Sequence, residues 1–498
     1  MPETAVPERR TKLRAAAAAR PDLLVLGALL AAGLGLRLWL VVAWRPAFLG
    51  FPDSYGYLLN SDPDWYFADG LRPMGYPLFL AAVRALSSEL TVTVLLQHAM
   101  GIAGGLCAYA AARAFGAGRW APLLPAAVLL LHGSLVWLEH GILTEGPFSF
   151  LVCAALLPAA LAAQPARGPR ARAGLAALAG LVGALAVTVR PIALPSLALL
   201  ALWAAWALPG GARERLAAAA ALAVTAGGLL GANLSWANGE TGRYSFARHE
   251  YYAFYGRIAP FADCRRFDPP EGTDRFCPTT PPRTRPGPRY WVFESASPLV
   301  RSIGRPSAAV DPPDAHARVN AFSRAAALAQ PGDYLRAVGR DLVRLVDPDF
   351  PLNPNPAVGN GGSGGQPGRT MRSLPGRSTP RHERATLGLV ARLYSNDRIE
   401  RGRTGGFETY ERVTRLDGVP WLVLLALALA GPFVTGGRER RAALMLLAYS
   451  LTLTVAPVAL HSYDWRFQLV ALGPLAMASA FGLGGLAALL RRRQRAQG

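Results

Sequence analysis

Long apolar runs alternate with short polar segments along most of this chain. Runs of about 18 residues or more without acidic groups are long enough to cross a bilayer core of ~30 Å as helices. The expected spans are 22–43, 90–112, 119–137, 143–163, 173–189, 192–208, 216–235, 418–436, 441–460 and 467–490. The pattern therefore predicts an all-α polytopic membrane protein with about ten transmembrane helices.

Basic residues orient these spans, because cytoplasmic loops of membrane proteins are enriched in Arg and Lys. Clusters precede the first span and follow the second, fourth, sixth, eighth and tenth: Arg9, Arg10, Lys12, Arg14 and Arg20; Arg113 and Arg119; Arg167, Arg170 and Arg172; Arg213 and Arg215; Arg438, Arg440 and Arg441; and RRRQR at 491–495. Ten spans with both termini in the cytoplasm put every cluster on the cytoplasmic side. The loop 44–89, the turn 138–145, TVRP (188–191) and HSYDWR (461–466) then lie outside.

Five domains follow from this topology. They are a cytoplasmic tail (1–21), a seven-span module (22–235) with the first outer loop 44–89, an extracytoplasmic insertion (236–417), three C-terminal spans (418–490) and a second tail (491–498). The insertion is expected to be of mixed structure. Its aromatic-rich start, 248–264, is expected at the membrane surface, with two amphipathic helices in 315–346, a flexible link at 358–368 and helices in 385–394 and 407–416.

Composition narrows the class of protein further. The chain has 498 residues, of which 52% are hydrophobic and 17% charged, and a net charge of +20. The cations sit at span ends and form no single stripe, so binding of nucleic acid is excluded. The first apolar run is long and no clear cleavage site follows it, so we expect an anchor that is retained. Cys264 and Cys277 would form a disulfide if the insertion faces an oxidising compartment.

Ionisable residues gather at span ends on the expected outer face: Asp53, Glu139, His140, Glu145, Arg190, His461, Asp464 and Arg466. Each alone is compatible with a group at the headgroup level. Charges near hydrocarbon are costly and tend to surround water-filled functional cavities. Their gathering on one face therefore favours a site there, with Asp53 in FPDSYGYLLN (51–60) as its first carboxylate.

Three stretches carry a family resemblance. They are FPDSYGYLLN with LRPMGYPLFL (71–80), ILTEGPFSFLV (142–152) and TVRPIALPSLALL (188–200). Their order and spacing over 20–210 resemble GT-C glycosyltransferases, specifically bacterial glycosyltransferase family 39-like relatives of dolichyl-phosphate-mannose protein mannosyltransferases. HSYDWRFQLVALGP (461–474) looks like a degraded form of that family's C-terminal Arg-Tyr-x-x-Pro pattern. The insertion has no counterpart in the resemblance.

The resemblance implies a GT-C-like fold and inverting transfer of a sugar from a polyprenyl-phosphate carrier to an extracytoplasmic glycan, protein or lipid acceptor. Asp53 is the expected catalytic base, although it could instead cap a helix over SYGYLL. The expected phosphate-binding residues are Arg72, Arg190, His461 and Arg466, and those near sugar or acceptor are Tyr55, Tyr57, Tyr76 and Glu145.

Several points stay open. Glu145 could orient the sugar, pair with Arg190 or ligate a metal, and a divalent Mg or Mn ion held by Asp53 and Glu145 would be an alternative means of phosphate stabilisation. GYPLFLAAVRAL (75–86) could be a surface helix beside the carrier's isoprenoid tail. Mannose and arabinofuranose are the sugars considered, and no residue specifies either.

Rival functions are a secondary transporter or flippase of a lipid-linked or small polar substrate, a non-catalytic scaffold, and a ligase-type enzyme with a pyrophosphate-linked donor. A transporter predicts repeated halves and polar groups near the bilayer midplane. No repeat is visible here and the charges lie on one face, although His132 in the third span is an intramembrane polar residue. These features favour the enzyme over the transporter.

Overall fold

The computed structural model describes residues 20–49, 52–306, 314–347, 380–395, 400–401 and 404–497. Within them, seven helices are long and apolar enough to cross a membrane: α2 (Pro21–Ala43), α5 (Leu90–Phe115), α8 (Glu145–Ala162), α9 (Pro169–Val189), α11 (Ala212–Thr241), α20 (Gly437–Leu460) and α22 (Leu472–Gln497). Large apolar side chains such as Leu24, Val42 and Val224 are exposed on α2 and α11. Outward apolar side chains suit helices that face lipid, and the chain is an all-helical, multi-pass membrane protein.

The remaining expected spans differ in form. Two of them are shorter helices, α10 (Leu194–Ala207) and α19 (Val419–Val434). The span expected at 119–137 is two helices, α6 (Leu123–Leu131) and α7 (Gly133–Glu139), because the backbone is extended at His132. The His132 side chain accepts the N–H of Leu135 and so caps α7. The span expected at 467–490 is also divided, into α21 (Trp465–Leu469) and α22.

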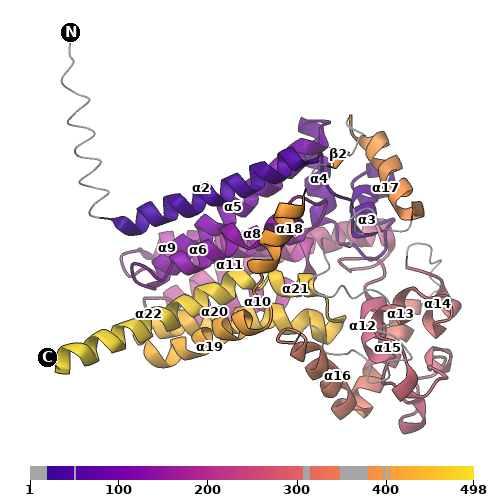
Figure 1. Cartoon of the computed structure of the whole chain (residues 1–498). Coiled ribbons are helices and arrows are strands. Elements are labelled where there is room, and N and C mark those ends of the chain that lie inside the picture. Colours follow the sequence, from indigo (N-terminus) through magenta and orange to yellow (C-terminus); the bar gives the residue numbers. More distant parts are fainter. Residues whose placement is uncertain are drawn as a thin grey trace.

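Both ends of the helix bundle are visible in Figure 1. The start of α2 and the end of α22 lie at one end of the bundle, and the short helices of the insertion lie at the other. α3 (Pro52–Asn60), α4 (Gly75–Leu86) and α17 (Pro380–Leu393) lie with the insertion, and α18 (Gly405–Val413) leads back to α19. In the described residues the strands are β1 (Trp44–Arg45) and β2 (Glu400–Arg401), which pair antiparallel.

The insertion has a hydrophobic core of its own, separate from the core of the spans. The helices around this core are α12 (Tyr251–Ile258), α13 (Pro288–Phe293), α14 (Pro298–Ile303), α15 (Ala315–Ala329) and α16 (Pro331–Val343), whereas α17 and α18 pack against the core of the spans. The insertion also contains the single turns η3 (Cys264–Arg266), η4 (Asp274–Phe276) and η5 (Pro282–Thr284), and two further single turns, η1 (Pro63–Trp65) and η2 (Pro191–Ala193), lie outside it. Tyr251, Tyr252 and Tyr255 are buried in this core. The aromatic residues of 248–264 therefore pack inside the insertion, and the membrane-surface position expected for this segment stays a prediction.

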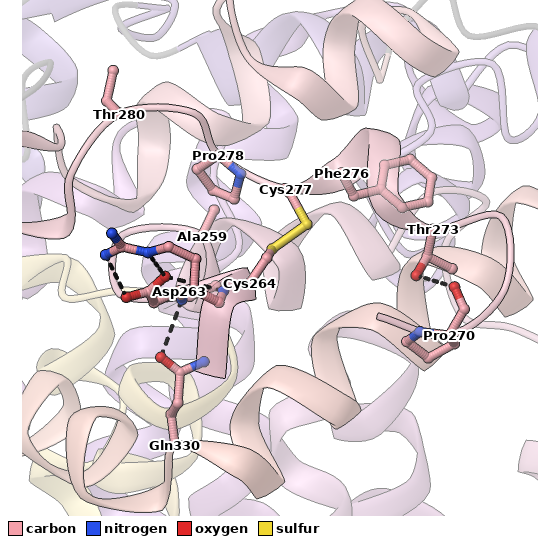
Figure 2. The surroundings of a disulfide bond; sticks show 12 residues. Ala259, Asp263, Cys264, Pro270, Thr273, Phe276, Cys277, Pro278, Thr280 and Gln330 are labelled. Carbon is pink, nitrogen blue, oxygen red and sulfur yellow. Dashed lines mark hydrogen bonds and ion pairs between the residues drawn. A yellow bond between two sulfur atoms is a disulfide. The ribbon is translucent and has the colours of Figure 1, made fainter. Parts of the chain in front are cut away.

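A disulfide joins Cys264 and Cys277, whose Cα atoms are 6.1 Å apart (Figure 2). The adjacent Asp263 N–H donates to Oε1 of Gln330 at 3.0 Å, which ties this loop to the junction of α15 and α16. The expected helices in 315–346 are α15 and α16, and those in 385–394 and 407–416 fall in α17 and α18. The expected link at 358–368 and both expected chain tails, apart from residues 20–21 and 491–497, lie outside the described residues.

Candidate active site

Asp53 lies in the first turn of α3 and is held by two arginines from distant parts of the chain. Its Oδ1 lies 2.5 Å from Nη2 of Arg72, and its Oδ2 lies 2.9 Å from Nη1 of Arg466. Both carboxylate oxygens therefore face guanidinium groups. Asp53 therefore pairs with side chains from two distant segments. The alternative expectation, that Asp53 only caps a helix, does not account for these ion pairs.

Arg72 is held in place by residues of its own loop, 44–89. Its Nη1 lies 2.9 Å and 2.8 Å from the two oxygens of Asp69. Asn60, the last residue of α3, accepts the Asp69 N–H at 2.8 Å and donates to the carbonyls of Asp69 and Arg72 at 3.3 and 3.4 Å. The same short helix thus carries Asp53 and orients the loop that supplies its arginine.

Arg466 approaches from the other end of the chain, on α21. Asp464 caps this helix by accepting the Arg466 N–H at 3.0 Å, and its Oδ2 lies 3.2 Å from Nη2 of Arg466. Nη1 of Arg466 also lies 3.5 Å from Oε1 of Glu145. One buried guanidinium therefore contacts three carboxylates from three separate segments.

Glu145 begins α8 and is completely buried. Its Oε1 pairs with Arg190, whose Nε donates to Oγ1 of Thr144 at 2.7 Å. The Arg190 guanidinium lies over the rings of Phe148 and Phe467, at 5.9 and 5.5 Å from their centroids. Of the three readings of Glu145, these contacts favour the pair with Arg190. Its Oε2 has no hydrogen-bond partner among the described residues.

The electrostatics of the site favour an ionised Asp53. Burial alone would raise the pKa of this carboxyl, but the guanidinium groups of Arg466 and Arg72 more than offset burial and hold the pKa well below its usual value. The Asp53 side chain is 27% exposed, whereas that of Glu145 is 0% exposed. Asp53 is therefore the carboxylate of this pair that an incoming molecule can reach.

The tyrosines expected at the site occupy different environments. Tyr57 is nearly buried and its hydroxyl lies 3.4 Å from Oγ1 of Thr144. Tyr76 is fully buried, donates to Oε1 of Gln97 at 2.5 Å and packs edge-on against Tyr57. As placed, Tyr76 supports Tyr57 and cannot itself touch a ligand that enters from solvent. Tyr55 is half-buried against the core of the spans.

His461 follows α20 and lies outside the ion pairs that hold Asp53 in the described residues. Its Nδ1 lies 2.7 Å from Oγ of Ser462, and its ring packs edge-on against Phe467 at 6.0 Å. Burial lowers the pKa of His461 to about 4. The imidazole is therefore neutral near pH 7, and it can contribute a hydrogen bond but not a positive charge.

The divalent cation that the sequence left open as an alternative would find few ready ligands at this site. In the described part of the chain, no group of three or more His, Cys, Asp or Glu side chains is placed to hold a metal. The oxygens of Asp53 face Arg72 and Arg466, and Oε1 of Glu145 is shared by Arg190 and Arg466. Guanidinium groups thus lie against three of the four oxygens of these two carboxylates, and Oε2 of Glu145 is the remaining one.

A second buried polar cluster supports the turn that leads to Glu145. Glu139 pairs with both Nε and Nη2 of Arg37 at 2.8 Å, and its Oε2 lies 3.1 Å from Nδ1 of His98. Gln97 donates to the carbonyls of Glu139 and Gly141 at 2.8 Å. Sequence reasoning missed Arg37, Gln97 and His98, as it missed Asn60, Asp69 and Thr144. For Arg37 the available signal was a lone cation inside an apolar run.

Comparisons with known proteins give matches in structure but not in sequence. No protein-family model and no curated protein matches this chain. The first similar structure is the S. cerevisiae protein O-mannosyltransferase Pmt1-Pmt2 complex bound to the sugar donor, with 15% identity and a TM-score of 0.35 over 48% of this chain and 36% of the other.

Two further structures match over most of this chain. The Archaeoglobus fulgidus oligosaccharyltransferase has 14% identity and a TM-score of 0.44 over 96% of this chain and 52% of the other. ArnT from Cupriavidus metallidurans bound to undecaprenyl phosphate has 14% identity and a TM-score of 0.35 over 92% and 77%. This chain thus spans about a third and about a half of the first two. At these scores no residue role follows from the three structures.

Proposed function

We propose that this chain is an integral membrane glycosyltransferase that transfers a sugar from a polyprenyl-phosphate donor to an extracytoplasmic acceptor with inversion. The observation that carries the proposal is the contact of one partly exposed carboxylate, Asp53, with Arg72 and Arg466 from opposite ends of the chain. This reaction requires a base for the acceptor hydroxyl and cations for the leaving phosphate. The resemblance of the motifs in 20–210 gives independent support.

Asp53 acts as the base in this proposal. The acceptor hydroxyl oxygen attacks the anomeric carbon and forms the new glycosidic bond, while the bond from that carbon to the phosphate oxygen breaks. The hydroxyl proton passes to Asp53, and the electron pair of the broken bond leaves with the polyprenyl phosphate. Asp53 suits this step because it is ionised and reachable from solvent.

The arginines meet the charge that grows on the leaving phosphate. Arg72 and Arg466 flank Asp53, and Arg190 is connected to them through Glu145. A planar guanidinium can hold two phosphate oxygens at once, and preorganised cations stabilise a transition state in which negative charge develops. His461 would add a neutral hydrogen bond at the edge of this site.

The surroundings suit a lipid-borne donor. α4 buries Leu80 and Val83 and exposes Leu78 and Leu86, so its outer face offers apolar surface to an isoprenoid tail. Tyr57 would lie at the edge of the sugar pocket. We propose further that the site faces the extracytoplasmic side of the cell membrane with both termini in the cytoplasm, in agreement with the disulfide of the insertion. Mannose and arabinofuranose are the sugars to test.

The decisive experiment compares Asp53→Asn with Asp64→Asn, a matched change of an exposed carboxylate in the same outer loop. Transfer from radiolabelled polyprenyl-phosphate sugars to candidate acceptors is expected to fall about 100- to 10,000-fold in Asp53→Asn. Asp64→Asn should transfer at the wild-type rate. Near-normal turnover by folded Asp53→Asn would remove Asp53 from the reaction, and labelled sugar that enters vesicles without a covalent product would favour the transporter.

The same assay tests dependence on a metal. Because arginines already neutralise Asp53 and Glu145, wild-type transfer in excess chelator is expected to stay within about twofold of the untreated rate. Loss of transfer that added Mg or Mn restores would show that a cation is required.

A further inference from the structure

One short helix of the insertion contacts both segments that supply arginines to Asp53. The His249 N–H, just before α12, donates to the carbonyl of Gly70 at 2.6 Å. At the other end of α12, Nε of Arg257 donates to the carbonyl of Val458 at 2.9 Å. Gly70 lies in the loop that leads to Arg72, and Val458 lies in the last turn of α20, ahead of α21. We name α12 with these two contacts the α12 strut.

The contact at Gly70 is too close for a side chain. A Cβ on this residue would lie 1.9 Å from Nδ1 of His249 and 2.7 Å from the carbonyl oxygen of Pro306. His249 is itself buried, and its Nδ1 lies 2.6 Å from that same carbonyl, so Nδ1 donates there. The insertion and the first outer loop therefore meet backbone to backbone at this point.

The contact at the end of α20 consists of several hydrogen bonds, most of them buried. Arg257 forms an ion pair with Asp341 of α16, and both side chains are 3% exposed. Asp341 also accepts the N–H of Tyr463 at 3.2 Å, and the Tyr334 hydroxyl donates to the carbonyl of Ala459 at 3.0 Å. The insertion thus binds the backbone on both sides of His461, directly before Asp464 and Arg466.

A buried ion pair adds little net stability compared with apolar packing, because both charges lose their hydration. The pair of Arg257 with Asp341 does, however, fix directions, since each partner also binds a backbone group of the C-terminal segment. This ion pair is therefore better explained by a role in positioning the C-terminal segment than by a contribution to the stability of the fold.

We propose that the α12 strut sets the separation of Arg72 and Arg466, and thereby the width of the anion site beside Asp53. Arg257 of the strut is a positioning residue, and so are Asp341 and Tyr334 of α16, which hold the same backbone segment, 458–463. The inference rests on the proposed function for the identity of the anion, a polyprenyl phosphate. The proposal that the α12 strut sets the separation of the two arginines depends only on the contacts described above.

The test uses two matched hydroxyl deletions in the full-length protein. Tyr334→Phe removes the bond to Ala459, and Tyr255→Phe removes a bond of the same kind to the carbonyl of Phe276, inside the insertion core. Arg257→Lys keeps the charge beside Asp341 but loses the second donor. One readout is hydrogen–deuterium exchange of the amides of 461–469. The other is equilibrium binding of a polyprenyl phosphate that carries no sugar.

Tyr334→Phe and Arg257→Lys are expected to exchange faster than wild type in 461–469 and to bind the lipid phosphate about fivefold more weakly, the effect of one lost hydrogen bond. Tyr255→Phe should match wild type in both readouts. Exchange at the wild-type rate in all three variants would refute the proposed role of the α12 strut. Faster exchange in Tyr334→Phe and Arg257→Lys without weaker lipid binding would refute it as well. Wild-type protein that shows no binding, while the exchange rates differ as expected, would refute the lipid-phosphate function and leave the geometric role standing.

Discussion

At the scale of single residues, Asp53 differs from the other two carboxylates of the cluster. It is partly exposed, whereas Glu145 is completely buried. It also pairs with two arginines from distant segments, whereas Asp464 pairs with Arg466, two residues along the chain. Residue type, position near the expected span ends and the family resemblance together predicted Asp53, Arg72, Arg190, Glu145 and Arg466 as site residues, and the structure brings them into one cluster. The roles proposed for them stay predictions.

The depressed pKa of Asp53 leads to a pH prediction. Because Arg466 and Arg72 keep this carboxyl ionised below its usual range, kcat/KM for transfer should not fall as the pH is lowered from about 7 to about 5. Arg466→Gln removes one of the two cations while burial still raises the pKa, so an acid limb is expected in that variant.

Arg466→Lys is the control, since it retains a positive charge beside Asp53, Glu145 and Asp464. The measurement is a pH profile of kcat/KM for the three proteins. An identical acid limb in wild type and in Arg466→Gln would contradict this account of Asp53.

Residue type could not predict the side chains that hold the cluster in place. Asn60, Asp69 and Thr144 act by bonding backbone or a neighbouring arginine, and such roles depend on distances that only the folded chain defines. Tyr76 was expected near the sugar because it lies in LRPMGYPLFL, one of the stretches that carry the family resemblance, and because an aromatic sugar pocket was expected. Its complete burial depends on how α4 packs, which a single sequence does not reveal.

At the scale of elements, α3 must lie unusually close to the loop that carries Arg72. A Cβ on Gly56 would lie 2.4 Å from Oδ2 of Asp69 and 3.0 Å from Cδ of Arg72. Gly56→Ala is therefore expected to displace the Asp69–Arg72 pair and to lower transfer about 10- to 100-fold. Helix propensity alone favours alanine over glycine, so it would predict a more stable α3 and no loss of transfer.

The control for this substitution is Gly27→Ala on α2, where a Cβ would meet nothing within 4 Å. Both changes place alanine in a helix, and only one crowds the site. Initial transfer rates and donor KM are the measurements. If Gly56→Ala transferred sugar as fast as Gly27→Ala, the close approach of α3 to Arg72 would have no functional consequence.

Apolar periodicity predicted the positions of the long helices well, because about 20 consecutive apolar residues leave few alternatives to a span. It did not reveal the interruption at His132, where a polar side chain satisfies a backbone N–H inside an apolar run. The α12 strut was also unpredictable. It depends on contacts between residues that are far apart in the sequence, such as Arg257 with Val458.

At the scale of the whole molecule, the start of α2 and the end of α22 lie at one end of the bundle and the short helices of the insertion at the other (Figure 1). The basic clusters predict that the termini are cytoplasmic. A cysteine introduced by Ser295→Cys, at an exposed position of the insertion, should react with a membrane-impermeant maleimide in intact cells. One introduced by Gln494→Cys, at the exposed end of α22, should react only after lysis. The reverse labelling pattern would invert the proposed topology.

The two ion pairs of Asp53 with Arg72 and Arg466 would determine the order in which donor and acceptor bind. While both carboxylate oxygens are paired with arginines, Asp53 is only a weak base toward an acceptor that arrives alone. An incoming carrier anion would compete for the same guanidinium groups, release the carboxylate and strengthen it as a proton acceptor. Catalysis would then be compulsory-order, with the lipid-linked sugar binding first, and water would be less readily activated in its absence.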